Sequence, residues 1–237
     1  VVHPPSHCPR CTTPIAPRDN VPVLSWLALR GRARCCGERI SVRYPLVEAG
    51  TALAFAGVAL WWRRACPVDG AAGVVLLVLL LGFAALSISL ALIDIDVFRL
   101  PWIMVAPSYP VVAVLLGAAA LLAREPARAV RMVVGALALW GLYRVLNLIR
   151  PDGMGMGDVR LAGVLGLVLA WFGWPELLVG AFGGFLLGAV GGIALTGLRR
   201  GWLKKQIPYG PWMLLGAWVG LLAGPGIARA YLDTLGA

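Results

Sequence analysis

One uncharged run sets the architecture of this chain: Ala72-Gly-Val-Val-Leu-Leu-Val-Leu-Leu-Leu-Gly-Phe-Ala-Ala-Leu-Ser-Ile-Ser-Leu-Ala-Leu-Ile93, which is followed by Asp94. A run of this kind is long enough to cross the ~30 Å hydrocarbon core of a bilayer as a helix. Because lipid offers backbone groups no hydrogen-bond partner, every crossing segment is expected to be helical. A carboxylate at the end of such a run is costly unless it is paired or hydrated, so Asp94 is a candidate functional residue.

The composition extends this interpretation to the whole chain. Of the 237 residues, 60% are hydrophobic and only 14% are charged, and the mean hydropathy is +0.84. These values exclude an ordinary soluble domain of this length and are typical of a polytopic membrane protein. The net charge is +10, but the basic residues gather in short connecting segments. That distribution favours membrane orientation over a role in nucleic-acid binding.

We predict an all-α polytopic membrane protein with about seven transmembrane helices. They are expected at 44–62, 72–97, 103–123, 129–148, 158–173, 176–198 and 208–232. The chain starts without Met, so we also expect that an eighth, N-terminal helix is missing from it. Residues 1–43 differ from the rest, since they hold six prolines and four of the five cysteines. We therefore divide the chain into a cysteine-containing loop domain, 1–43, and a transmembrane domain, 44–237.

The basic residues also predict the orientation in the membrane. Fourteen Lys and Arg residues fall on the side of 1–43, including those of the 199–207 connection, and five fall on the opposite side. The positive-inside rule then places residues 1–43 in the cytoplasm. Counting helices from there brings Asp94 and Asp158 to the same cytoplasmic end of the bundle.

Two carboxylates at one membrane depth suit the hydrolysis of a peptide bond. One takes a proton from water, the other gives a proton to the scissile carbonyl, and a close pair shares one proton because both cannot ionise. Asp158 follows Gly155-Met-Gly157, and glycines there permit unusual backbone angles and the close approach of a substrate strand. Structural roles are equally open to these acids: Asp158 caps a helix, Asp94 is a buried polar contact or part of an ion path, and Asp96 is interfacial.

At these residues the chain resembles the type IV prepilin peptidases, which are intramembrane aspartyl proteases with a Gly-x-Gly-Asp motif. The resemblance covers nearly the whole chain. It is carried by Asp94-Ile-Asp-Val-Phe-Arg-Leu-Pro101, Gly155-Met-Gly-Asp-Val-Arg-Leu161, Pro208-Tyr-Gly-Pro211, Ser6-His-Cys-Pro-Arg-Cys11, Asp19-Asn-Val-Pro-Val-Leu-Ser-Trp26 and Ile40-Ser-Val-Arg-Tyr-Pro-Leu-Val-Glu48. Two positions depart from the family pattern: Trp102 follows Pro101 where an Asp is usual, and Arg160 replaces a Lys.

The resemblance implies an enzyme that removes the short basic leader from prepilin or pseudopilin precursors at the cytoplasmic face of the bacterial inner membrane. Asp94 and Asp158 would be catalytic. Residues expected to bind substrate or shape the site are Gly155, Gly157, Arg160, Pro101, Glu48, Tyr209 and Gly210. Arg160 would steady a substrate carboxylate or anchor its helix at the interface, and Glu48 is equally explained as an interfacial acid. Many family members also methylate the new N-terminus with S-adenosylmethionine.

The cysteines predict a structural zinc site. The family has two Cys-x-x-Cys pairs; here Cys8 and Cys11 form the first, while in the second Ala33 takes the leading position and Cys36 is preceded by an extra Cys35. Cys8, Cys11, Cys35 and Cys36 are therefore the expected ligands. Three cysteines with His7, or free thiols without metal, are the alternatives. Cys66 falls on the outer side and receives no role.

Two other functions compete with the peptidase. The carboxylates could relay ions in a proton- or ion-coupled transporter, although no inverted repeat is visible. The chain could also be a non-catalytic scaffold for pilus or secretion assembly. In each case the expected surroundings are membrane lipid, and no nucleic acid is involved.

Overall fold

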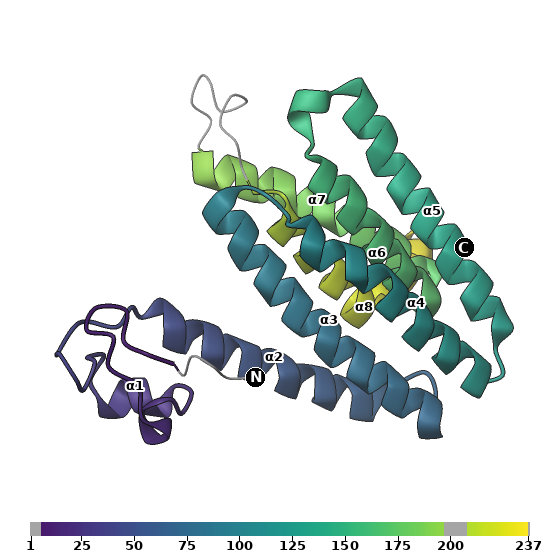
Figure 1. Ribbon diagram of the computed structural model, residues 1–237. Helices are drawn as coiled ribbons and strands as arrows, with labels where there is room; N and C mark the ends of the chain where they lie inside the picture. The colour runs from purple at the N-terminus through teal and green to yellow at the C-terminus, as the bar shows by residue number, and fades with distance from the viewer. Residues whose placement is uncertain (1–5, 197–207, 237) are drawn as a thin grey trace. The chain divides into compact units, whose positions relative to one another are not determined.

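The computed structural model describes residues 6–196 and 208–236, and within them the chain is helical, as predicted (Figure 1). A short helix, α1, spans Leu24–Ala28. Seven long helices follow: α2 Arg43–Ala65, α3 Gly70–Val97, α4 Trp102–Leu122, α5 Pro126–Ile149, α6 Met156–Phe172, α7 Trp174–Thr196 and α8 Gly210–Leu235. Each of the seven predicted segments overlaps one of these helices, but only six of the described helices are long and apolar enough to cross a membrane, so the predicted number of seven transmembrane helices is supported for six. The 199–207 connection and the end of the predicted 176–198 helix lie outside the described residues.

The chain forms two compact units, Val1–Gly57 and Val58–Ala237. In the first unit, short loops surround α1 and the start of α2. The Trp26 indole donates to the carbonyl of Ile40 (3.0 Å), and the Val23 amide donates to the Glu48 carboxylate (2.7 Å). The guanidinium of Arg34 forms a forked ion pair with Asp19. Polar contacts of this kind stabilise the loops in place of a large apolar core.

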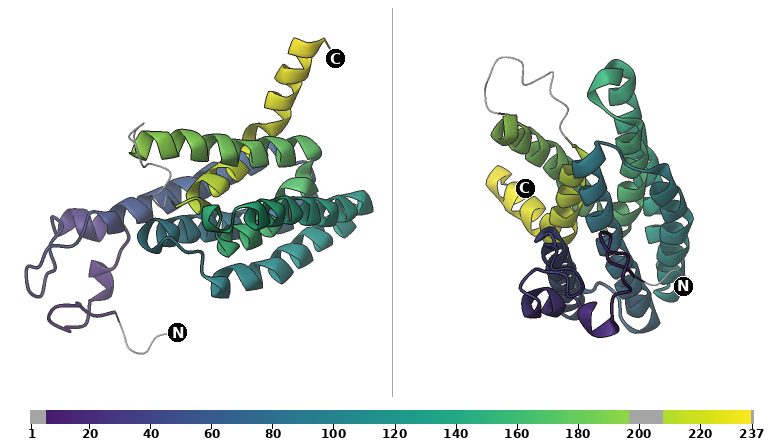
Figure 2. Two further views of the ribbon diagram at one scale, coloured as in Figure 1. Left: turned by 90° about the horizontal axis from the view of Figure 1, so that it is seen from above. Right: turned by 60° about the vertical axis from the view of Figure 1, so that its left-hand side comes forward.

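The second unit is a helical bundle, and six helices of the described chain are long and apolar enough to cross a membrane: α2, α3, α4, α5, α7 and α8. The seventh, α6, has only 17 residues. Every residue from Leu161 to Trp171 is buried within the protein. α6 contacts α4, α5, α7 and α8 (Figure 1, Figure 2). It is therefore a central helix covered by its neighbours.

Small residues let these helices approach at backbone distance. A Cβ on Gly166 of α6 would lie 2.6 Å from the Cα of Ala136 in α5. A Cβ on Gly216 of α8 would lie 2.6 Å from the Cα of Gly184 in α7. The glycines of 180–191 are thus explained by close packing against neighbouring helices, which is the usual reason for small residues in membrane bundles.

The C-terminal end of α6 is fixed by a cation. The Arg131 guanidinium, from α5, donates hydrogen bonds to the carbonyl groups of Ala170, Trp171 and Phe172. These carbonyls lack partners within their own helix, and a positive charge there also suits the helix dipole. The Trp171 indole donates to the Leu116 carbonyl of α4 (3.0 Å). The far end of α6 is thereby held to two neighbouring helices.

Candidate active site

Asp94 lies in the last turn of α3 and is 4% exposed. Its Oδ2 accepts a hydrogen bond of 2.9 Å from the amide of Gly210, the first residue of α8. Just beyond it, Phe98 ends α3 in the left-handed region (φ 54°), where a bulky residue is strained, and its amide donates to the Asp94 carbonyl. Strained backbone of this kind is concentrated at functional sites. The turn sends the chain back toward the carboxylate.

Asp158 lies in the first turn of α6. The N-cap residue of this helix is Gly155, whose carbonyl accepts the Asp158 amide (3.1 Å). The Asp158 carboxylate in turn accepts a hydrogen bond from the Gly155 backbone, so Asp158 also helps to cap the helix from within its first turn. A Cβ on Gly155 would lie 3.3 Å from Asp158 Oδ2. Glycine at 155 therefore leaves the carboxylate room. A carboxylate at this position also gains from the positive end of the helix dipole.

The bundle brings the two carboxylates together. Asp94 and Asp158 come from different helices, α3 and α6, and their charges interact. Leu100 lies beside both of their segments: a Cβ on Gly157 would approach the Leu100 Cβ to 2.9 Å, and a Cβ on Gly210 would approach Leu100 Cδ2 to 3.1 Å and Asp94 Oδ2 to 2.9 Å. Gly157 and Gly210 thus permit a contact that any larger residue would obstruct.

Two tyrosines complete the surroundings of the pair. The hydroxyls of Tyr143 in α5 and Tyr209 before α8 lie 3.2 Å apart, and both side chains interact electrostatically with Asp158. Tyr209 was expected from its motif. Tyr143 was missed because the sequence of an apolar helix does not show which face a single tyrosine lies on. Leu100 was missed because an apolar residue in a short connection does not show which helices it will contact.

The remaining expected site residues have separate roles in the structure. Pro101 is the N-cap residue of α4. The Arg160 guanidinium lies over the Trp102 ring, 4.5 Å from its centroid, and the Tyr109 hydroxyl donates to the Arg160 carbonyl. The two departures from the family pattern therefore contact each other through a cation–π interaction. Glu48 belongs to the first compact unit, where it accepts the Val23 amide.

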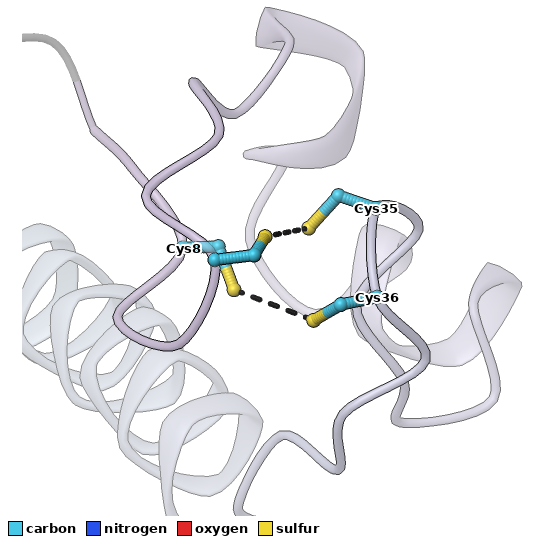
Figure 3. A group of neighbouring side chains, drawn as sticks. Cys8, Cys35 and Cys36 are labelled. Atoms are coloured by element: carbon cyan, nitrogen blue, oxygen red, sulfur yellow. Dashed lines mark hydrogen bonds between the residues drawn. The ribbon is translucent and has the colours of Figure 1, made fainter.

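The four expected cysteines form a cluster in the first unit. Two loops supply two sulfurs each, and an isolated backbone bridge closes each loop, His7 with Pro14 and Arg32 with Arg39. The Sγ atoms of Cys8, Cys11, Cys35 and Cys36 all lie within 4.8 Å of one another. Figure 3 shows the sulfurs of Cys8 and Cys36 facing each other at 3.7 Å, with Cys35 turned into the same space. Although Cys35 and Cys36 are neighbours in the sequence, both of their sulfurs belong to the cluster.

The four sulfurs lie close enough together to hold one metal ion. Zn–S bonds of about 2.3 Å place the sulfurs of a tetrahedral site ~3.8 Å apart, close to the separation of Cys8 and Cys36. The hydrogen-bonded contacts of the Cys11 sulfur with Thr13 Oγ1 (3.3 Å) and Cys35 Sγ (3.1 Å) lower the pKa of the Cys11 thiol to about 6, while the contact with Cys11 raises the pKa of Cys35 to about 12. A thiolate is the form that binds metal.

A cavity of about 620 Å³ lies at the opposite end of α6 from Asp158. Its lining includes Trp61, Phe172, Glu176 and Arg229. None of the expected site residues lines it, so it is separate from the carboxylate pair.

Fold and site together define a class of protein: a helical bundle in which six described helices are long and apolar enough to cross a membrane, with two interacting acidic side chains from different helices. Comparison with known proteins gives the same class. The model of the bacterial peptidase A24 N-terminal domain matches residues 1–63, and that of the type IV leader peptidase family matches residues 81–193. No solved structure matches the chain.

Similar full-length proteins identify the family. A prepilin leader peptidase/N-methyltransferase of Aeromonas salmonicida is 38% identical over 235 residues, covering 98% of this chain and 76% of that protein. Proteins of the same name from Pseudomonas putida and Pseudomonas aeruginosa are 37% and 36% identical, and 77% of each is covered. The chain belongs to the type IV leader peptidase family, which confirms the resemblance found in its motifs.

Proposed function

We propose that this protein is an intramembrane aspartyl endopeptidase that removes the leader peptide from type IV prepilins or related pseudopilins. The observation that carries the proposal is the pairing of Asp94 and Asp158 at one end of the bundle. Membership of the leader peptidase family supports the same activity, since the similar proteins are named prepilin leader peptidases.

The chemistry needs only the two carboxyl groups and water. In the proposed reaction the ionised carboxylate takes a proton from water, and the oxygen attacks the scissile carbonyl carbon while the protonated carboxyl gives its proton to the carbonyl oxygen. Proton return to the leaving nitrogen then breaks the C–N bond. We assign Gly155, Gly157 and Gly210 to the walls of this site, because each leaves space beside Asp94, Asp158 or Leu100.

The orientation and location follow from the same proposal. The distribution of basic residues supports a cytoplasmic position for the cysteine loops and for the carboxylate pair. The bacterial origin of the similar proteins supports the inner membrane as the location. α6 would then be the seventh crossing, lying among the other helices.

Zinc and methylation are the second part of the proposal. The fit of four converging sulfurs supports a structural zinc held by Cys8, Cys11, Cys35 and Cys36. When bound, zinc would crosslink the two loops. Methylation of the new N-terminus with S-adenosylmethionine rests on the name of the similar proteins.

Mass spectrometry of a type IV prepilin, incubated with membranes containing the protein, tests the peptidase. We expect a shortened product from the wild type and an intact precursor with Asp94→Asn or Asp158→Asn. Each substitution removes a group that must hold or transfer a proton. Asp96→Asn is the matched control, because Asp96 is an exposed acid two residues from Asp94. Cleavage that persists in both Asn variants would overturn the assignment of Asp94 and Asp158 as the catalytic residues. A precursor left intact by folded wild-type protein would favour the transporter or scaffold functions.

A further inference from the structure

Tyr143 is a buried polar residue for which the reaction described above gives no role. It lies in the second half of α5 and is 2% exposed. A hydroxyl inside a membrane bundle is costly unless it forms a hydrogen bond. The partner of Tyr143 is the hydroxyl of Tyr209, at 3.2 Å. The question is therefore what this hydroxyl pair holds in place.

The pair is connected to Asp94 through a short stretch of backbone. Tyr209 directly precedes Gly210, whose amide donates to Asp94 Oδ2 at 2.9 Å. The Tyr209 carbonyl accepts the amides of Trp212 and Met213 and so begins α8. Fixing the Tyr209 side chain therefore fixes the peptide group that holds the Asp94 carboxylate.

Aromatic packing restricts Tyr209 further. Phe185 of α7 packs against both tyrosines, with its ring centroid 5.2 Å from that of Tyr143 and 6.1 Å from that of Tyr209, and the two tyrosine centroids lie 6.3 Å apart. A Cβ on Gly188 would come within 2.7 Å of the Tyr209 ring, so α7 has glycine where that ring lies. Aromatic rings at these separations attract each other beyond the effect of their buried area. The hydroxyl contact then selects one position for the tip of the ring.

The same two side chains also face the second carboxylate, since Asp158 interacts electrostatically with both. The group formed by Tyr143, Phe185 and Tyr209 thus links α5, α7 and the start of α8 beside both candidate catalytic residues. None of these three elements carries a catalytic candidate, because Asp94 belongs to α3 and Asp158 to α6.

We propose that Tyr143 is a positioning residue for the peptidase: its hydroxyl holds Tyr209, and through it the Gly210 amide that orients Asp94. The inference rests on the proposed peptidase function. It assigns Tyr143 no contact with the substrate, so its contribution belongs to the chemical step and not to binding of the precursor. It also makes the two hydroxyls a single functional unit, since neither can act without the other.

Steady-state cleavage of a prepilin by Tyr143→Phe, which loses the hydroxyl and keeps the ring, tests the inference. We expect kcat to fall about tenfold, an effect typical of one lost hydrogen bond to a buried group, with KM unchanged. Tyr209→Phe should cause a similar loss, and the double variant should be no worse than either single one, because all three lack the same contact. Tyr231→Phe, at an exposed tyrosine of α8, is the control and should retain wild-type kinetics.

Wild-type enzyme and Asp158→Asn serve as the references. If the wild type cleaves and Asp158→Asn does not, then a normal kcat in Tyr143→Phe overturns the positioning role alone. The positioning role would also be overturned if the loss of kcat in the double variant were the product of the two single losses. It would likewise be overturned if Tyr143→Phe lowered the unfolding temperature and raised KM together with the loss of activity. If folded wild-type protein leaves the precursor intact, the proposed function fails and this inference fails with it.

Discussion

Gly157 has no Cβ, and this leaves room for Leu100 to pack against the start of α6 beside the two carboxylates. The left-handed Phe98 returns the chain so that Leu100 lies against the first turn of α6. The contact involves the Cβ of Leu100, which cannot move independently of the backbone. Tolerance to added volume should therefore be low at position 157.

Gly157→Ala is expected to lower prepilin cleavage about tenfold or more. The new methyl group would lie 2.9 Å from the Leu100 Cβ, and overpacking of this kind typically costs about 1–3 kcal/mol. Gly82→Ala in α3 is the matched control, because a Cβ there meets nothing within 4 Å. Initial rates from both variants at equal membrane levels make the comparison. If Gly157→Ala cleaved as fast as Gly82→Ala, the connection that contains Leu100 would have to shift to make room for the new methyl group.

Sequence reasoning reached the acidic residues and missed their neighbours for a physical reason. A carboxylate in an apolar run is unusual by itself, so Asp94 and Asp158 were found without a structure. Leu100 and Tyr143 are ordinary among apolar residues, and their importance comes only from what they touch. The cluster of four cysteines was predictable because thiols at close spacing carry their own chemistry, whereas zinc binding stays a prediction.

Among the helices, α6 differs from the rest in how it is stabilised. Apart from Arg160 its residues from Val159 to Trp171 are buried, so contacts with protein replace those with lipid. The hydropathy of 158–173 predicted its existence but not its burial, since a helix inside a membrane bundle and one facing lipid are equally apolar. Its C-terminal carbonyls depend on Arg131, a residue that sequence reasoning counted only for orientation.

Arg131→Met is expected to destabilise the bundle by about 2 kcal/mol, because three carbonyls at the end of α6 lose a charged donor and regain no partner. Thermal unfolding in detergent should show a lower transition temperature. Arg124→Met is the control, since Arg124 is exposed in the preceding turn. An unchanged transition for Arg131→Met would mean that water or lipid replaces the guanidinium.

The protein consists of two compact units that are stabilised by different kinds of interaction. The unit Val58–Ala237 is held by helix packing at glycines, whereas the unit Val1–Gly57 is held by hydrogen bonds, ion pairs and the converging cysteines. Composition distinguished these regions in the sequence. The proposed boundary between residues 43 and 44 stays a prediction, because α2 begins at Arg43 and continues across both compact units.

Cys36→Ser is expected to reduce bound zinc from about one ion per chain to well below that level. A site with three sulfurs lacks the fourth ligand that closes a structural zinc site. Elemental analysis of the purified protein measures the metal, and Cys66→Ser is the control because Cys66 lies outside the cluster. We expect prepilin cleavage to survive better than N-methylation in the zinc-depleted variant. Equal loss of both activities would indicate that the loops support the entire fold.

The late position of Gly210 has a consequence for the synthesis of the protein. Asp94 emerges from the ribosome early, but the amide that holds it belongs to the last helix. A nascent chain that has inserted α3 and α6 carries both acids, yet it lacks Tyr209 and Gly210 and leaves part of α6 uncovered. On the proposed roles of these residues, proteolytic competence would arise only after the start of α8 has been made.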